Sequence, residues 1–187
     1  MPEDGRKRVI IEKVAPEIDD GHFPVKRVNG EKVVVSADVF TDGHDKIHAV
    51  LKYREYGDDE WNLVAMEPLV NDRWEGSFRV TDVGEYEYTV EAWVDHFKTW
   101  QADLQKKHDD GQDVSVDLQI GAEMLESGAK RAAGDDVDQL KAVADDLQSK
   151  GDQPQKVERA TSNDVTALME KYPDRRFSRI YSKNLRV

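Results

Sequence analysis

Hydrophobic and polar residues alternate through most of the first half of the chain, which is the period of a β-strand with one buried face. Turn residues such as Asn29-Gly30 and Asp42-Gly43 separate the alternating segments. Short strands at this spacing predict a β-sandwich, with strands at residues 8–14, 32–40, 47–55, 61–66, 73–80 and 85–94. Pro24 makes residues 23–28 a further edge strand or an irregular segment, because proline cannot donate to a ladder of hydrogen bonds.

The period changes within EAWVDHFKTWQADLQKK, residues 91–107. Phe97, Trp100 and Leu104 recur at spacings of three and four, as they do on one face of a helix. The same spacing, together with capping and stop residues, predicts four helices, at 97–108, 113–129, around 137–147 and at 162–172. The intervening Gly-Asp-Gln-Pro at 151–154 is predicted to be a polar loop. Four short amphipathic helices predict a small bundle.

The final residues, 175–187, return to an extended pattern in which Tyr181, Leu185 and Val187 share a face. A sandwich built only from the earlier strands would keep an open edge, which this tail can cover as an added strand. The sequence therefore predicts an α+β fold with two domains. Residues 1–96 plus 175–187 form a β-sandwich, and residues 97–174 form a helical-bundle insertion before its last strand.

The sequence from Asp82 to Tyr86 has the D-x-G-x-Y spacing of a tyrosine corner, in which the tyrosine hydroxyl bonds back to nearby backbone. This corner marks the start of strand F in immunoglobulin-like sandwiches, so the predicted sandwich is immunoglobulin/fibronectin-III-like. Residue 88, where antibody domains carry cysteine, is tyrosine, as a sandwich without disulfides requires. The pattern indicates an architecture and carries no information about function.

Composition excludes several classes of function. The chain has 187 residues, a formal net charge of −12 and no cysteine, so nucleic acid is a poor partner and cysteine-based metal sites are excluded. The length is too short for a sandwich plus a (β/α)8 barrel, which alone needs roughly 250 residues. No apolar run is as long as a membrane span, and MPEDGRKRV lacks the apolar region of a secretory signal. Cytoplasmic residence without a membrane partner is expected.

Four residues at the change of period, Trp93, Asp95, His96 and Trp100, are of types that catalysis and sugar binding both use. Alternation places Trp93 on a polar strand face, where it is either covered by the helices or another domain, or serves as a platform for a sugar ring. Asp95 and His96 are adjacent, so on a strand they point to opposite faces and cannot form a simple dyad. His96 is expected to bond to backbone at the strand end.

No other pattern predicts chemistry. No HExxH motif of a helical zinc site is present, because His44 and His48 are four residues apart but lie in a turn and a predicted strand, with Asp45 after the first histidine. The carboxylates lie in polar turns rather than in apolar settings that raise a pKa for acid catalysis. TDGHDK at 41–46 lacks the spacing and the closing glutamate of an EF-hand. No nucleophile elbow or phosphate-binding loop is found. We therefore predict no catalytic, cofactor-binding or metal-binding residues, and no cofactor.

Four segments together resemble one family: DGRKRVIIEKVAPEID, HFPVKRVNGEKVVVSADVFTDGHD, GEYEYTVEAWVDHFKTWQADLQKK and GQDVSVDLQIGAEMLE. The chain resembles the N-terminal, non-catalytic region of the α-1,4-glucan:maltose-1-phosphate maltosyltransferases, relatives of glycoside hydrolase family 13. The resemblance implies a sandwich-like domain with a helical-bundle insertion. It also implies a following catalytic barrel that transfers maltosyl units from maltose 1-phosphate to α-glucan. The catalytic carboxylates of the family lie in that barrel and have no counterpart in this chain.

The resemblance further implies a scaffold that packs on its catalytic barrel and helps to form a homodimer. On this basis Trp93, Asp95, His96 and Trp100 are assigned to a domain or dimer interface. Two alternatives remain open: a carbohydrate-binding module that holds α-glucan through exposed Trp or Tyr, and a free-standing enzyme. The chain alone is not expected to be an enzyme, whereas its parent protein is expected to be a maltosyltransferase.

Overall fold

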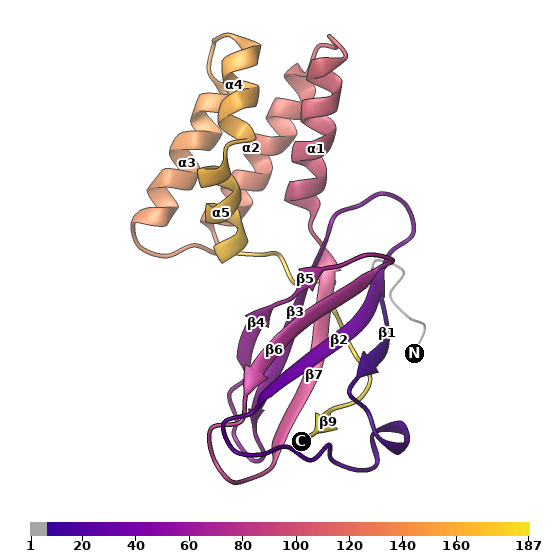
Figure 1. Ribbon diagram of the computed structural model, residues 1–187. Helices are drawn as coiled ribbons and strands as arrows, with labels where there is room; N and C mark the ends of the chain where they lie inside the picture. The colour runs from indigo at the N-terminus through magenta and orange to yellow at the C-terminus, as the bar shows by residue number, and fades with distance from the viewer. Residues whose placement is uncertain (1–6) are drawn as a thin grey trace. The chain divides into compact units, whose positions relative to one another are not determined.

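The computed structural model describes residues 7–187, which combine antiparallel sheets with helices, so the α+β class is confirmed (Figure 1). The chain divides into two compact units. The sheet unit comprises the chain up to Val94 together with Arg175–Val187. The helical unit comprises Asp95–Asp174 and lies, in chain order, between the strands β7 and β8.

The sheet unit contains two antiparallel sheets. One has the order β1-β2-β6-β5, formed by Ile10–Ala15, Lys32–Phe40, Arg73–Arg79 and Glu67–Pro68. The other has the order β4-β3-β7-β8, formed by Asn62–Ala65, Ile47–Glu55, Tyr86–Val94 and Arg179–Ile180. The short β9, Leu185–Arg186, also pairs with β7, and the 3-10 turn η1 spans Asp19–Gly21.

One hydrophobic core draws on both sheets and follows the alternation of the sequence. The inward residues of β2 are all buried, and so are those of β7: Val33, Val35, Ala37 and Val39, and Tyr86, Tyr88, Val90, Ala92 and Val94. Aromatic rings link the two sheets, since Phe78 of β6 stacks on Tyr53 of β3 at 4.5 Å between ring centroids. The sheets are therefore held together by alternate side chains, as the predicted β-sandwich requires.

The tyrosine corner is confirmed in its hydrogen bonds. The Tyr86 hydroxyl accepts from the backbone N–H groups of Thr81 and Asp82, at 3.3 and 3.2 Å. Tyr88, at the position of the antibody cysteine, is fully buried, and its hydroxyl donates to the Pro16 carbonyl. Burial raises the pKa of the Tyr88 hydroxyl, so this group stays protonated and keeps its role as a donor.

The tail pairs with β7, as predicted, but in two short pieces rather than as one strand. Register pairs Ile180 with Glu91 in β8 and Leu185 with Tyr88 in β9. Leu185 and Val187 are buried in the core. The segment 23–28 forms no named strand, because Pro24 interrupts the pattern, although the N–H of Val25 donates to the carbonyl of Arg186 at 2.9 Å.

The helical unit contains α1 to α5, which span His96–Asp109, Ser115–Ala129, Asp135–Gln148, Gln153–Ala160 and Asn163–Lys171. Four of these helices lie where the sequence predicts them. The sequence analysis missed α4, because residues 151–154, which include Pro154, are predicted to be a polar loop. Pro154 occupies the first turn of α4, where its missing N–H has no helical partner to lose and its fixed φ suits the helix.

The core of the helical unit includes one buried polar side chain. Its apolar part is built from residues such as Leu104, Leu125 and Leu140, each with no exposed surface. Gln101 of α1 lies among them and donates from Nε2 to the carbonyl of Ala160 at 2.8 Å and to the Thr166 hydroxyl at 2.9 Å. These bonds tie α1 to the end of α4 and to α5 and satisfy a group that is costly to bury alone.

Asp136, in the first turn of α3, gives the helical unit a dependence on acid pH. Its Oδ2 accepts from the Tyr172 hydroxyl at 2.8 Å and pairs with the Lys171 ammonium at 3.1 Å. These two partners, Tyr172 first, hold the pKa of Asp136 below its ordinary value. A carboxyl whose pKa is lowered by folding stabilises the fold above its unfolded pKa, about 3.9 for aspartate, and loses that effect as pH falls through its folded pKa.

We therefore expect Asp136→Asn to lower the free energy of unfolding at pH 7, and expect its difference from the unaltered protein to shrink below about pH 4. Urea titrations followed by circular dichroism at pH 7, 5, 4 and 3 measure both quantities. The exposed Asp138, in the same helical turn, supplies the matched variant Asp138→Asn. A difference that stays constant down to pH 3 contradicts the assigned ion pair.

Candidate functional site

Trp93 lies near the end of β7 on its outward face and is 4% exposed. The imidazole of His48, its cross-strand neighbour on β3, stacks on the indole with 4.9 Å between ring centroids. The guanidinium of Arg175 lies over the indole at 4.6 Å from the centroid. A ring covered in this way offers no free face to a sugar, so the interpretation of Trp93 as an exposed platform is wrong.

Asp95 and His96 do not lie on a strand, because β7 ends at Val94. Asp95 is the N-cap of α1, and its Oδ1 accepts from the backbone N–H of Lys98 at 2.9 Å. His96, which was expected to bond to backbone at a strand end, is instead the first residue of α1 and is exposed. Of the four predicted residues, His96 alone is exposed and directly available to a partner.

Trp100 joins α1 to α2 within the helical unit. Its indole is 7% exposed, and Nε1 donates to the carbonyl of Asp117 at 2.8 Å. The ring lies so close to Gly121 of α2 that a Cβ atom there would stand 2.0 Å from Cζ2. Trp100 and Trp93 are therefore buried by their own surroundings, and a partner surface can use neither ring directly.

The outward face of the five-stranded sheet carries a row of opposite charges that the sequence analysis did not predict. Cross-strand pairs place Arg54 beside Glu87, at 2.9 Å between Nη2 and Oε2. Lys52 lies 3.4 Å from the carboxylate of Glu91, and Arg175 lies 3.9 Å from the same carboxylate. The Glu91 side chain is only 7% exposed, so these two cations compensate a charge that would otherwise be costly to bury.

Trp61, which precedes β4, lies over this row of charges. The guanidinium carbon of Arg54 is 4.3 Å from the indole centroid, and the Lys52 ammonium is 5.5 Å from it. Arg54 is itself fixed, because Nε and Nη2 donate to Glu87 and Nη1 donates to the carbonyl of Asp58. The immobilised cation thus holds the indole in one orientation. We call Trp61, Arg54, Lys52, Glu87 and Glu91 the outer-face cluster.

The sequence contained one signal for this cluster. Trp61 was assigned to a strand without a role, because its neighbours in sequence, Glu60 and Asn62, are polar turn and edge residues. The pairing of Tyr53 with Asn62 places Trp61 opposite Arg54, and that register cannot be inferred from alternation within one strand. Lys52 and Arg54, two residues apart on one strand face, are the part of this cluster that the sequence shows directly.

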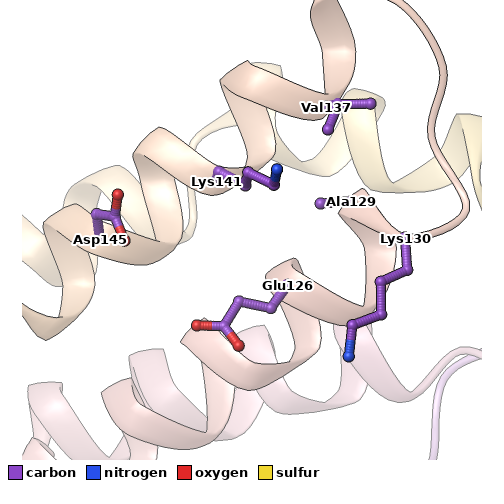
Figure 2. A pocket seen from close by; sticks show the side chains of 6 residues that line it. All are labelled: Glu126, Ala129, Lys130, Val137, Lys141 and Asp145. Atoms are coloured by element: carbon purple, nitrogen blue, oxygen red, sulfur yellow. The ribbon is translucent and has the colours of Figure 1, made fainter.

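The helical unit carries a hollow of about 410 Å³ between α2 and α3. Figure 2 shows Glu126, Ala129 and Lys130 on one side, and Val137, Lys141 and Asp145 on the other. Lys141 reaches from α3 toward Ala129 at the end of α2 (Figure 2). Two ammonium groups and two carboxylates share the hollow, so its charge favours neither an anion nor a cation.

Residues 7–187 contain no group of three or more histidine or acidic side chains arranged to hold a metal ion. Over the same residues, every helix is too short or too polar to meet the requirement for crossing a bilayer.

Comparison with known proteins gives the same family along the whole described chain. Residues 7–187 match the family described as alpha-1,4-glucan:maltose-1-phosphate maltosyltransferase, domain N/S. The maltosyltransferase of Chlorobaculum tepidum is 50% identical over 184 residues, a match that covers 98% of this chain and 27% of the relative. The enzyme of Myxococcus xanthus is 41% identical over 192 residues, with 96% and 28% covered.

A third relative, the maltosyltransferase of Methylacidiphilum infernorum, is 38% identical over 182 residues, with 95% of this chain and 26% of the relative covered. The chain thus spans about a quarter of the length of the curated relatives it matches. The resemblance inferred from the four sequence segments is confirmed, because identity extends across both the sheet unit and the helical unit. The chain belongs to the α-1,4-glucan:maltose-1-phosphate maltosyltransferase family and corresponds to its domain N/S.

Proposed function

We propose that this chain is the accessory N-terminal region of a maltosyltransferase that extends α-1,4-glucan from maltose 1-phosphate, with the catalytic groups in a separate barrel related to glycoside hydrolase family 13. One observation carries the proposal. The relatives are named for that activity, and nearly the whole of this chain aligns with about a quarter of their length. We assign the transfer chemistry to the part of the relatives that this chain does not match, because no candidate catalytic residues were identified in its sequence.

We infer further that the sheet unit is an immunoglobulin/fibronectin-III-like sandwich. In that fold one sheet has the strands A, B, E and D, and the other has C′, C, F and G. The orders β1-β2-β6-β5 and β4-β3-β7-β8 follow this pattern when the tail serves as strand G. The tyrosine corner at the start of β7 supports its identification as strand F.

The proposed role is that of a rigid scaffold that packs on the catalytic barrel and contributes to a homodimer. Trp93 and Trp100 are buried and support this role indirectly, because each fixes the neighbouring strands or helices whose outer sides form the proposed interface. Asp95 caps α1, and the exposed His96 is the one residue of the four placed to contact a partner directly. In the proposed interface, Trp93, Asp95 and Trp100 act through packing or capping within the chain, and only His96 contacts the partner with its own side chain.

A chimera tests the proposal. This chain replaces the matched quarter of the Chlorobaculum tepidum relative, and transfer of maltosyl units from maltose 1-phosphate to maltohexaose is measured. We expect activity within about tenfold of the natural relative and a mass of two subunits by light scattering. The same relative without its matched quarter is the control, and it is expected to lose both properties.

This chain alone is the second control, and we expect it to release no phosphate from maltose 1-phosphate. Turnover by the isolated chain overturns the accessory role. An active deletion control overturns the scaffold role, because the catalytic part would then need no support.

A further inference from the structure

The open edge of the five-stranded sheet displays aromatic and apolar side chains. β4 is the outermost strand of the order β4-β3-β7-β8, and Figure 1 shows it at the margin of the sheet unit. Leu63 of β4 is 48% exposed, and Tyr56, in the turn between β3 and β4, is 62% exposed. Trp61 lies between them in sequence and is half-buried. Tyr56, Trp61 and Leu63 thus place apolar surface close together in sequence at one edge of the sheet, where it can contribute to a binding surface.

The indole of Trp61 is prepared for stacking. Lys52 and Arg54 are two residues apart on β3, so both cations approach the ring from the surface of the sheet. The cations therefore contact the indole, and the half-buried Trp61 keeps part of its surface exposed. Because Arg54 is fixed by Glu87 and by the carbonyl of Asp58, the ring loses little freedom when a ligand stacks on it.

The charges around this ring favour a neutral, hydroxyl-rich ligand. The cations beneath it are paired with Glu87 and Glu91, so they attract no further anion. The exposed acidic turn at 58–60 repels phosphate and nucleic acid but offers carboxylate oxygens that accept hydrogen bonds from hydroxyl groups. A pyranose ring has an apolar face that stacks on an indole and hydroxyl groups at its rim, which matches both features.

We propose that Trp61 and Tyr56 form a binding site for an α-1,4-glucan chain. Trp61 is the stacking platform, Tyr56 contacts a neighbouring sugar, and the turn at 58–60 accepts hydrogen bonds from hydroxyl groups. The choice of α-glucan over other neutral sugars rests on the proposed function, because the relatives are named for that polymer. The site itself rests on the geometry of the outer-face cluster.

Nuclear magnetic resonance on the unaltered protein gives the direct test. The chain has four tryptophans, so four indole N–H signals are followed during titration with maltoheptaose. We expect the Trp61 signal to shift with saturation, while the signals of the buried Trp93 and Trp100 stay in place. A titration without saturation up to about 20 mM, or a saturable shift confined to the other indoles, overturns the proposal.

Variants measured by calorimetry complete the test. We expect Trp61→Ala to weaken maltoheptaose binding at least tenfold and Tyr56→Ala to weaken it about threefold. Phe23, another aromatic ring of the sheet unit, is 58% exposed, and Phe23→Ala is the matched control expected to bind normally. Trp61→Phe, which keeps an aromatic ring, is expected to retain most of the affinity. Equal weakening by Phe23→Ala overturns the site.

The ligand is tested with cellohexaose, which has the same hydroxyl groups but β-1,4 linkages. We expect it to bind at least tenfold more weakly, and equal binding overturns the assignment to α-glucan. The result is independent of the chimera. An active chimera with no maltoheptaose binding refutes this site and leaves the accessory role intact. Maltoheptaose binding together with an inactive chimera supports this site and refutes the accessory role.

Discussion

Gly121→Ala is expected to destabilise the helical unit by about 3 kcal/mol or more, although alanine is the better helix former by about 1 kcal/mol. The added Cβ would stand 2.0 Å from Cζ2 of Trp100 and 2.3 Å from Cη2. The indole cannot move away freely, because Nε1 is bonded to the carbonyl of Asp117 and the ring is packed in the core. Either the two helices separate or Trp100 leaves its site.

Urea denaturation followed by far-ultraviolet circular dichroism measures this change, and the indole N–H signal of Trp100 in nuclear magnetic resonance spectra reports the ring itself. Gly128→Ala, on the same helix, is the matched control. The nearest atom there is the Sδ of Met169 at 2.6 Å, at the end of a flexible side chain that can turn aside. We expect the control to cost much less than Gly121→Ala. Equal costs for the two variants contradict the assigned contact between Trp100 and Gly121.

Removal of residues 175–187 is expected to unfold the sheet unit. The tail buries Leu185 and Val187, and its backbone exchanges two hydrogen bonds between Val187 and Tyr86, at 2.8 and 3.0 Å. Two buried aliphatic side chains contribute about 2 kcal/mol each and the hydrogen bonds about 1 kcal/mol each, so the total approaches the whole stability of a small domain. The exposed edge of β7 is also expected to promote aggregation.

Near-ultraviolet circular dichroism and size-exclusion chromatography of the chain ending at Asp174 measure both effects. Two point variants separate the contribution of the core from that of the edge. Leu185→Ala is expected to cost about 3 kcal/mol, because a fully buried side chain is removed. Ile180→Ala, at a position 49% exposed, is expected to cost under 1 kcal/mol. A truncated chain with an unchanged urea midpoint shows that the tail is dispensable.

The strands could be predicted from sequence where β-branched or alternating residues lie between turn residues. β2 and β3 have the predicted bounds because turn residues such as Asp42-Gly43 lie close to their ends. Prediction failed at α4, where the helix is short and its only local signal, Pro154, has opposite meanings in a loop and in a first turn. The side chains that bury it, Val157 and Ala160, are too few to show a period.

The candidate site was harder to predict, because its geometry depends on contacts between distant segments. Trp93 was recognised as an aromatic ring on a polar face, but its cover comes in part from Arg175, beyond the helical unit in sequence. Trp61 gained its meaning only from the register of β4 on β3. Residue type thus identified Trp93 as a candidate, whereas only strand pairing revealed the surroundings of Trp61.

Since β8 and β9 pair with β7, the order of synthesis constrains how the protein folds. The partner strands are separated by the helical unit, Asp95–Asp174, so the strands that complete this edge of the sheet are synthesised after the helices. Closing a flexible loop of that length costs about 2.5 kcal/mol more entropy than closing a five-residue hairpin. A helical unit that folds first shortens this loop. The sheet in the nascent chain therefore keeps an unpaired edge at β7 until the helices have formed.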